Sequence, residues 1–293
     1  MKLTIQLPTD RVHEPDEFLT AAALAEMGAC VEQAGFDACF VTDHPAPTDD
    51  WLASGGHQTL DPFVALSFVA AATSRIRLQL HVLIAAYRNP FLSAKAIASL
   101  DVLSGGRVIA GMAAGYLEGE FDALGVDFAA RNEITDERIR EMKRIWEGGS
   151  ITLAGRDFRA EGITTLPRPA QRPHPPIWIG GNSKLAIRRA AELGDGWLPF
   201  PTPKPMAERV RTAVLATLDD LRDRIAFLRA CEKEAGRSAP LDVAFVPWGM
   251  RMNANEPVDF AKLADTSAEL GELGVTWLTI NPPRGTRAAY CDW

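Results

Sequence analysis

Residues 76–115 read IRLQLHVLIAAYRNPFLSAKAIASLDVLSGGRVIAGMAAG and contain a complete strand–helix–strand pattern. The run at 76–85 is typical of a buried strand, and residues 91–103 have apolar positions at helical spacing. Gly105 and Gly106 then end the helix, and RVIAGMAAG (107–115) predicts a second strand. Two such strands joined by a covering helix form the repeating unit of a parallel sheet.

The same alternation extends along the chain in both directions. Eight short apolar runs alternate with helical segments, at 3–7, 36–44, 76–85, 107–115, 175–181, 195–200, 241–248 and 275–280. Eight strands separated by helices favour a closed (β/α)8 TIM barrel over an open doubly wound sheet. We therefore predict an α/β fold with a single barrel domain over residues 1–293 and an insertion at 117–175, between strands 4 and 5.

Local signals between these strands predict the helix boundaries. Asp61 is a good N-cap and Pro62 suits the first helical position, so a helix is expected over 61–73. Apolar spacing predicts further helices over 17–34 and 214–234. ITLAGRDFRAEG (151–162) reads as a hairpin around a Gly-Arg-Asp turn.

Composition excludes several classes of protein. The formal net charge of −7 argues against nucleic-acid binding, and no apolar run is long enough to cross a membrane. The start MKLTIQLPTD lacks the features of a signal peptide, and the four scattered cysteines read as free thiols, so we expect a cytoplasmic protein. No two of the five histidines stand at metal-ligand spacing, so no metal site is expected.

Four of the predicted strands hold polar or glycine-rich residues at or near their ends. These residues are Thr42-Asp43-His44, His81, the run Gly111–Tyr116, and Gly180-Gly181-Asn182-Ser183. The catalytic residues of barrel enzymes lie at these carboxyl ends of the strands. His44 is therefore the candidate catalytic residue, and a histidine that only completes the hydrogen bonding of a strand end is the alternative.

The segment IGGNSK (179–184) has a specific physical interpretation. Two glycines allow a close turn, and Asn182 and Ser183 begin a helix whose free N–H groups attract an anion. A plain strand-to-helix turn with a serine N-cap explains the segment equally well.

Four long strings of the chain are specific in their order: EQAGFDACFVTDH (32–44), TSRIRLQLHVL (73–83), YRNPFLSAKAIASLDVLSGGRVIAGMAAGYLEGEF (87–121) and PPIWIGGNSKLAIRRAAELGDGW (175–197). These strings resemble the luciferase-like monooxygenase family, and in particular its F420-dependent oxidoreductases. The resemblance implies a (β/α)8 barrel, usually a homodimer, which holds a phosphorylated flavin or deazaflavin across the strand ends.

The resemblance also implies roles for individual residues. His44 would lie beside the cofactor ring, and a non-prolyl cis peptide near His81-Val82 would back the ring. The cofactor phosphate would be held by Ala114, Gly115, Gly180, Gly181, Asn182 and Ser183, with Arg88 and Lys184 as further contributors.

The implied function is hydride transfer between coenzyme F420 and a small organic substrate. An FMN-dependent monooxygenase is the alternative within the family. A non-catalytic flavin-binding barrel and a metal-dependent hydrolase are the alternatives outside it. The chain departs from the F420-dependent glucose-6-phosphate dehydrogenases, since Tyr116 stands where they carry a catalytic carboxylate and Thr48 where they carry a tryptophan.

Two acidic residues of the insertion, Glu118 and Glu120, open a predicted helical segment and read as its solvated start. A position facing the barrel opening is the alternative for either of them. The substrate itself is not predicted, because specificity lies in loops such as 45–60 and 117–131 and in the region after Pro199.

Overall fold

The computed structural model describes residues 1–250 and 258–293, and within them eight parallel strands close into a barrel. The order around the barrel is β1-β10-β9-β8-β7-β4-β3-β2. These strands are β1 (Lys2–Gln6), β2 (Ala38–Val41), β3 (Arg77–Ile84), β4 (Val108–Ala113), β7 (Ile177–Gly180), β8 (Gly196–Leu198), β9 (Asp242–Phe245) and β10 (Trp277–Ile280). The predicted (β/α)8 TIM barrel is confirmed.

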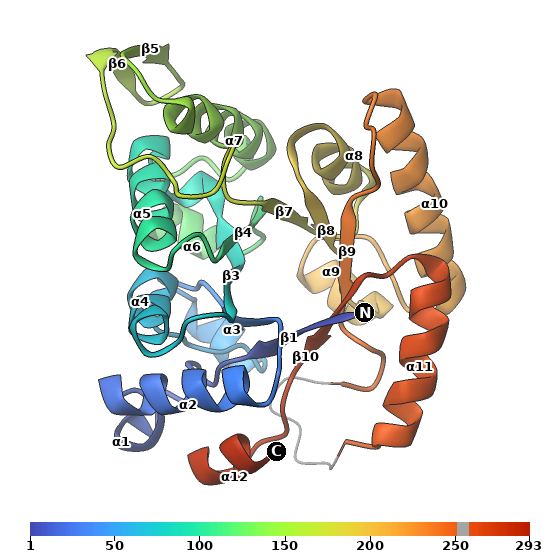
Figure 1. Cartoon of the computed structure of the whole chain (residues 1–293). Coiled ribbons are helices and arrows are strands. Elements are labelled where there is room, and N and C mark those ends of the chain that lie inside the picture. Colours follow the sequence, from blue (N-terminus) through green and yellow to red (C-terminus); the bar gives the residue numbers. More distant parts are fainter. Residues whose placement is uncertain (251–257) are drawn as a thin grey trace.

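A helix covers the barrel after each strand, as Figure 1 shows. In chain order these helices are α2 (Ala21–Gln33), α4 (Pro62–Ala72), α5 (Pro90–Leu103), α7 (Arg131–Glu147), α8 (Lys184–Leu193), α10 (Leu218–Glu234), α11 (Phe260–Leu273) and α12 (Arg287–Asp292). Shorter elements lie in the connections: α1 (Pro15–Phe18), α3 (Asp49–Ala53), the 3-10 turn η1 (Ala85–Tyr87), α6 (Glu118–Ala123) and α9 (Lys204–Arg209).

The insertion between the fourth and fifth barrel strands contains the predicted hairpin. Its strands β5 (Ile151–Ala154) and β6 (Arg159–Ile163) pair antiparallel, apart from the barrel sheet. They lie beyond the end of α7, at the upper edge of Figure 1.

Side-chain caps explain where the helix predictions succeed and where they fail. The Asp61 carboxylate accepts from the N–H groups of Phe63 and Val64, at 2.9 and 3.1 Å, so α4 begins as predicted. The prediction of one helix over 17–34 is wrong, because Thr20 is extended and caps a new helix, α2. The predicted helix over 214–234 begins only at Leu218, because Thr217 and Asp220 form a capping box there.

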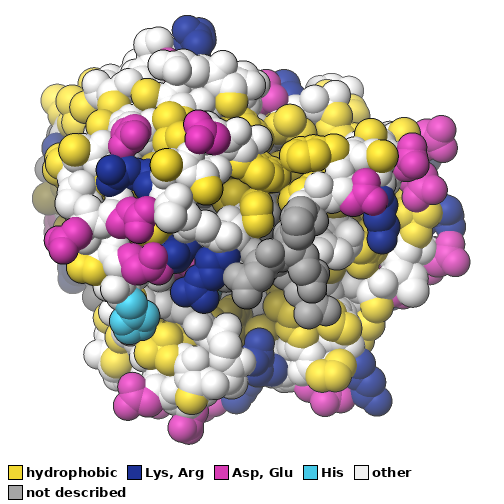
Figure 2. Space-filling model, turned by 90° about the horizontal axis from the view of Figure 1, so that it is seen from below, with side chains coloured by type: hydrophobic (Ala, Val, Ile, Leu, Met, Phe, Trp, Pro, Cys, Tyr) yellow, Lys and Arg dark blue, Asp and Glu magenta, His cyan; other side chains and the backbone are white. Residues whose placement is uncertain are grey.

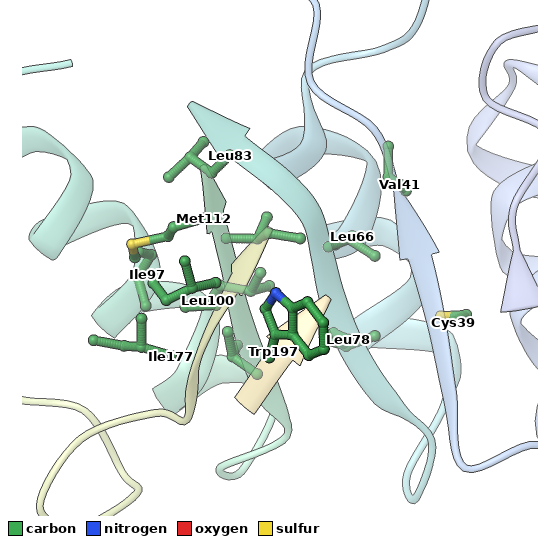
Figure 3. Close-up of a cluster of buried hydrophobic side chains, with 14 of the residues drawn as sticks. Cys39, Val41, Leu66, Leu78, Leu83, Ile97, Leu100, Met112, Ile177 and Trp197 are labelled. Carbon is green, nitrogen blue, oxygen red and sulfur yellow. The ribbon is translucent and has the colours of Figure 1, made fainter. Parts of the chain in front are cut away.

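The core lies between the strands and the surrounding helices. Figure 3 shows part of it, where Leu78, Leu83 and Met112 of the strands meet Ile97 and Leu100 of α5. All five side chains are almost fully buried. This packing is typical of a barrel in which strands with continuous apolar runs are covered by helices.

Arg107, directly before β4, is a buried connector between three elements. Its Nε donates to the Ser104 carbonyl at 2.7 Å, and Nη1 donates to the Ile76 carbonyl at 2.9 Å. Its two terminal nitrogens also donate to Thr73 Oγ1, the Thr73 carbonyl and the Ala70 carbonyl, at 2.8 to 3.0 Å. The guanidinium thereby donates hydrogen bonds to backbone carbonyls at the carboxyl ends of α4 and α5 and directly before β3.

Candidate functional site

A cavity of about 940 Å³ opens where the strands end. Its lining includes eight of the predicted site residues, namely His44, His81, Val82, Ala114, Gly115, Gly180, Gly181 and Ser183, but not Asn182. Its walls also include apolar side chains such as Leu198, Met206 and Trp248. Figure 2 shows one face of the molecule, with a hollow bordered by hydrophobic side chains and basic side chains close by. The volume is large enough for a cofactor and a small substrate.

Aromatic side chains surround His44 in this cavity. The ring centroid of Trp51 on α3 lies 4.4 Å from the centroid of the His44 imidazole. The ring centroid of His57 lies 4.9 Å from it, and these two rings meet edge to face. Tyr116, after β4, is 6.4 Å away. Thr48, the position at which relatives were expected to carry tryptophan, instead caps α3 and so places the indole of Trp51 against His44.

The three histidines of the cavity differ in their electrostatic surroundings. Burial, and then the nearby His44, lower the pKa of His57 to about 3, and burial lowers the pKa of His81 to about 4. Both are therefore neutral at pH 7. His57 Nε2 lies 3.1 Å from Thr42 Oγ1, and His81 Nδ1 lies 3.1 Å from Gln79 Nε2. His44 alone among these three has a carboxylate neighbour in the described part of the chain, at Glu120.

The peptide bond between His81 and Val82 is cis, as the resemblance implied. It lies where the pairing of β3 with β4 shifts register, between Leu80 and Leu83. Both His81 and Val82 line the cavity. The irregular part of β3 is therefore one wall of the site.

The expectation that Glu120 is solvated is wrong, whereas Glu118 is exposed as expected. The Glu120 side chain is 1% exposed and that of Glu118 is 53% exposed. The Tyr87 hydroxyl donates to Glu120 Oε2 at 2.7 Å, and burial followed by this carboxylate raises the pKa of Tyr87 well above its ordinary value. Contacts from η1, after β3, and from the loop after β2 thus bury a residue whose local sequence reads as surface.

The turn from β7 into α8 presents a backbone surface to the cavity. Gly181 has a φ of +118°, and a Cβ added to Gly180 would lie 3.2 Å from Val82 Cγ1. Ser183 caps α8 by accepting from the Ala186 N–H at 3.1 Å, so its hydroxyl hydrogen is left to donate elsewhere. The turn is both a capped helix start and a surface on which an anion can rest.

Asn182 has a different role from its neighbours. Its side chain is fully buried; Nδ2 donates to the Phe200 carbonyl and Oδ1 accepts from the Phe200 N–H, at 2.9 and 3.1 Å. Nδ2 also donates to Thr202 Oγ1 at 2.8 Å. The side chain braces the segment after β8 and lies outside the cavity lining.

Gly115 shows how closely the β4 end approaches its neighbours. Its φ is +81°, and an added Cβ would lie 2.8 Å from Ile84 Cγ2 and 2.9 Å from a ring carbon of Phe121. A side chain at this position would force the wall to move. The backbone of Ala114 and Gly115 therefore forms a compact part of the lining.

Three arginines that the sequence did not single out also line the cavity: Arg131, Arg189 and Arg211. The guanidinium carbons of Arg131 and Arg211 lie 4.0 and 4.6 Å from the ring centroid of Phe128. Arg189 is buried against Asp136 and Asn132, and Arg211 pairs with Glu118 at 2.8 Å. No carboxylate lies within 4.0 Å of Arg131 in the described part of the chain.

Arg88 and Lys184 do not line the cavity. Arg88 donates to both oxygens of Asp43, at 2.7 and 3.1 Å, and Lys184 lies over the ring of Phe227. Their expected part in phosphate binding therefore has no support in the geometry of the cavity.

Comparison with known proteins gives the family. A model described as luciferase-like monooxygenase matches residues 1–250. The FMNH2-dependent dimethylsulfone monooxygenase of Pseudomonas putida is 28% identical over 204 residues, which are 69% of this chain and 53% of that protein, so the match spans about half of the relative. The F420-dependent glucose-6-phosphate dehydrogenase of Intrasporangium calvum is 27% identical over 278 residues, covering 86% and 79%.

A solved structure supports the fold. The monooxygenase RslO1 from Streptomyces bottropensis superimposes with a TM-score of 0.76 at 20% identity, covering 100% of this chain and 96% of that one. Because the family model matches most of the sequence, the chain belongs to the luciferase-like monooxygenase family of oxidoreductases.

Proposed function

We propose that the chain is an F420-dependent oxidoreductase that transfers a hydride between the deazaflavin and a small organic substrate. The names of its relatives include both F420-dependent and FMNH2-dependent enzymes, so the relatives do not indicate which of the two cofactors this chain binds. The observation that favours F420 is the pair of arginines, Arg131 and Arg211, that meet at the ring of Phe128 in the cavity lining. FMN ends in one phosphate, whereas F420 continues beyond its phosphodiester into a tail of carboxylates that additional cations can bind.

The residues present fit such a cofactor. Gly180, Gly181 and Ser183, with Ala114 and Gly115, would hold the phosphate at the start of α8. His81 and Val82 would support the ring system, and His44 would hydrogen-bond near its reacting edge. Bound F420 supplies or accepts the hydride, while the protein orients the ring, excludes water and positions the substrate.

A binding titration tests the proposal. Purified protein is titrated with F420 and, separately, with oxidised and reduced FMN, with fluorescence as the readout. We expect saturable binding of F420 that is at least about tenfold tighter than binding of either form of FMN, a difference of about 1.4 kcal/mol. Tight binding of FMN with none of F420 would establish the FMN-dependent monooxygenase instead.

Removing Arg131 or Arg211 is expected to weaken F420 binding selectively. Each of the variants Arg131→Ala and Arg211→Ala loses charge-assisted hydrogen bonds to the tail, so we expect about a tenfold rise in Kd for F420. The Kd for F420 truncated after its phosphate should change much less. Arg222→Ala is the control, because that arginine pairs with Asp219 and is half exposed. Equal losses for full-length and truncated cofactor would contradict a role in tail binding.

We further propose that the protein is a homodimer that pairs through α4 and α5. These adjacent helices expose Val64 and Phe68 on α4 and Leu92 and Leu103 on α5, with exposed fractions from 45% to 77%. Phe68→Glu places a charge on this apolar face, so we expect a dimer-to-monomer shift in sedimentation velocity at micromolar concentration. Phe260→Glu, the same change at an exposed position of α11, should leave the dimer intact. A monomeric parent protein would refute the assembly.

The remaining proposals concern location. No helix in the described ranges combines the length and the apolar character needed to cross a membrane. Cys30, Cys39, Cys231 and Cys291 are all free thiols. Free thiols are usual in a reducing compartment, which supports the proposed cytoplasmic location.

A further inference from the structure

Glu120 is a buried carboxylate that the proposed hydride transfer does not itself require. It lies on α6, within the insertion, and its partners come from distant parts of the chain. Oε1 accepts from the Ala46 N–H at 3.2 Å, and Oε2 accepts from the Tyr87 hydroxyl at 2.7 Å. Burying a carboxylate is costly unless hydrogen bonds compensate it, so this arrangement needs an explanation.

The remaining neighbour of Oε2 is His44. Its Nδ1 lies 3.5 Å from Oε2, is buried, and has no hydrogen-bond partner among the described residues. If Nδ1 carried no hydrogen, its lone pair would face a carboxylate oxygen. If it carries the hydrogen, the same contact brings an N–H donor close to a carboxylate oxygen, and a reorientation of the ring toward Oε2 would complete the bond.

We infer that Glu120 is the positioning residue for His44, holding the imidazole as the Nδ1–H tautomer and leaving Nε2 as the basic nitrogen. Tyr87 fixes the carboxylate in turn, through the bond to Oε2. The inference rests on the proposed role of His44 for its functional meaning. The tautomer itself is a property of the protein without cofactor or substrate.

The assignment can be tested by nitrogen NMR of protein labelled with ¹⁵N-histidine. The five histidines keep the spectrum simple, and His44→Asn identifies the His44 signals. In the neutral form of His44 we expect a protonated Nδ1 and an unprotonated Nε2 in the cofactor-free protein. In Glu120→Met the Nε2–H form, which free histidine prefers, should become the major tautomer.

The controls separate positioning from general structural damage. Asp122→Asn changes an exposed carboxylate on the same helix and should leave the His44 signals unchanged. Tyr87→Phe keeps the carboxylate, so Nδ1–H should persist. If Glu120→Met does not fold, Glu120→Gln is the test variant, and an unchanged tautomer in it would contradict the assignment. Glu120→Gln keeps a carbonyl acceptor and should give a mixture of the two tautomers.

An Nε2–H tautomer in the parent protein, or an unchanged tautomer in folded Glu120→Met, would overturn the assignment. Failure of F420 to bind would refute the proposed function but would not alter the tautomer result. Once a substrate is known, Glu120→Met should lower kcat on the order of 100-fold and KM much less, because it affects proton handling by His44.

Discussion

His44→Ala is expected to lower the rate of hydride transfer by about 10²- to 10⁴-fold, the usual contribution of a positioned acid–base group. His44 lies in the cavity, and its imidazole has a buried carboxylate 3.5 Å from Nδ1. We expect no replacement by His57 or His81, because burial lowers their pKa values to about 3 and about 4, which makes both imidazoles weak bases. The rate is measured from the absorbance change of F420 with any substrate that the parent enzyme turns over.

Cofactor affinity distinguishes catalysis from binding in this experiment. The Kd of F420 in His44→Ala should rise far less than the rate falls, because the phosphate and tail contacts remain. His13→Ala, which removes an exposed histidine before α1, is the matched control and should keep the parent rate. If the His44→Ala enzyme kept the parent rate but bound F420 more weakly, His44 would contribute to cofactor binding and not to catalysis.

The second large effect is on stability, at Arg107. Arg107→Ala removes the donor for the carbonyls of Ala70, Thr73, Ile76 and Ser104 while they stay largely buried. Unsatisfied buried acceptors cost about 1–3 kcal/mol each and do not add fully, so we expect the free energy of unfolding to fall by about 3–5 kcal/mol. Urea unfolding followed by circular dichroism measures the difference.

Two substitutions show whether the geometry of the guanidinium is responsible. Arg107→Lys keeps the charge but cannot reach all of these acceptors, so its loss should be intermediate. Arg75→Ala removes an exposed arginine nearby, and its effect should stay within about 0.5 kcal/mol. An Arg107→Ala protein as stable as the parent would mean that water or a shifted backbone satisfies the freed carbonyls.

The barrel could be predicted because its signals are local. The apolar run of β3, the glycines after α5 and the Asp61-Pro62 start of α4 each indicate one element from a few neighbouring residues. The parallel arrangement and the closure then follow from the count of strands. The helix errors at Thr20 and Thr217 arose where a threonine cap begins a new helix inside a stretch of apolar spacing.

A site residue could be predicted only where its place at the end of a strand shows that it lies at the opening of the barrel. Gly180 ends β7, and His44 and Ser183 stand three residues beyond the ends of β2 and β7, so the topology alone brings them to one opening. Glu120 could not be found in this way, because Tyr87, more than thirty positions away, determines its burial. The prediction correctly put Asn182 in the turn between β7 and α8, but the contacts of its side chain depend on the segment after β8.

Trp51 and the three arginines show the same limit. The Thr48-Asp49-Asp50-Trp51 sequence signals a short capped helix, yet nothing local says that its indole will contact an imidazole. Arg131 begins α7 and Arg211 follows α9, and both lie over the ring of Phe128. Such pairings come from tertiary structure, which the pattern of one sequence does not encode locally.

The neighbours of His44 come from two separate excursions of the chain, one carrying α3 and the other α6. Neither contributes a strand to the barrel ladder. Sequence changes in either connecting segment can therefore accumulate without disrupting the barrel strands. We expect a chimaera that exchanges only residues 45–60 with a relative to acquire new substrate preferences. Its melting temperature should stay close to that of the parent.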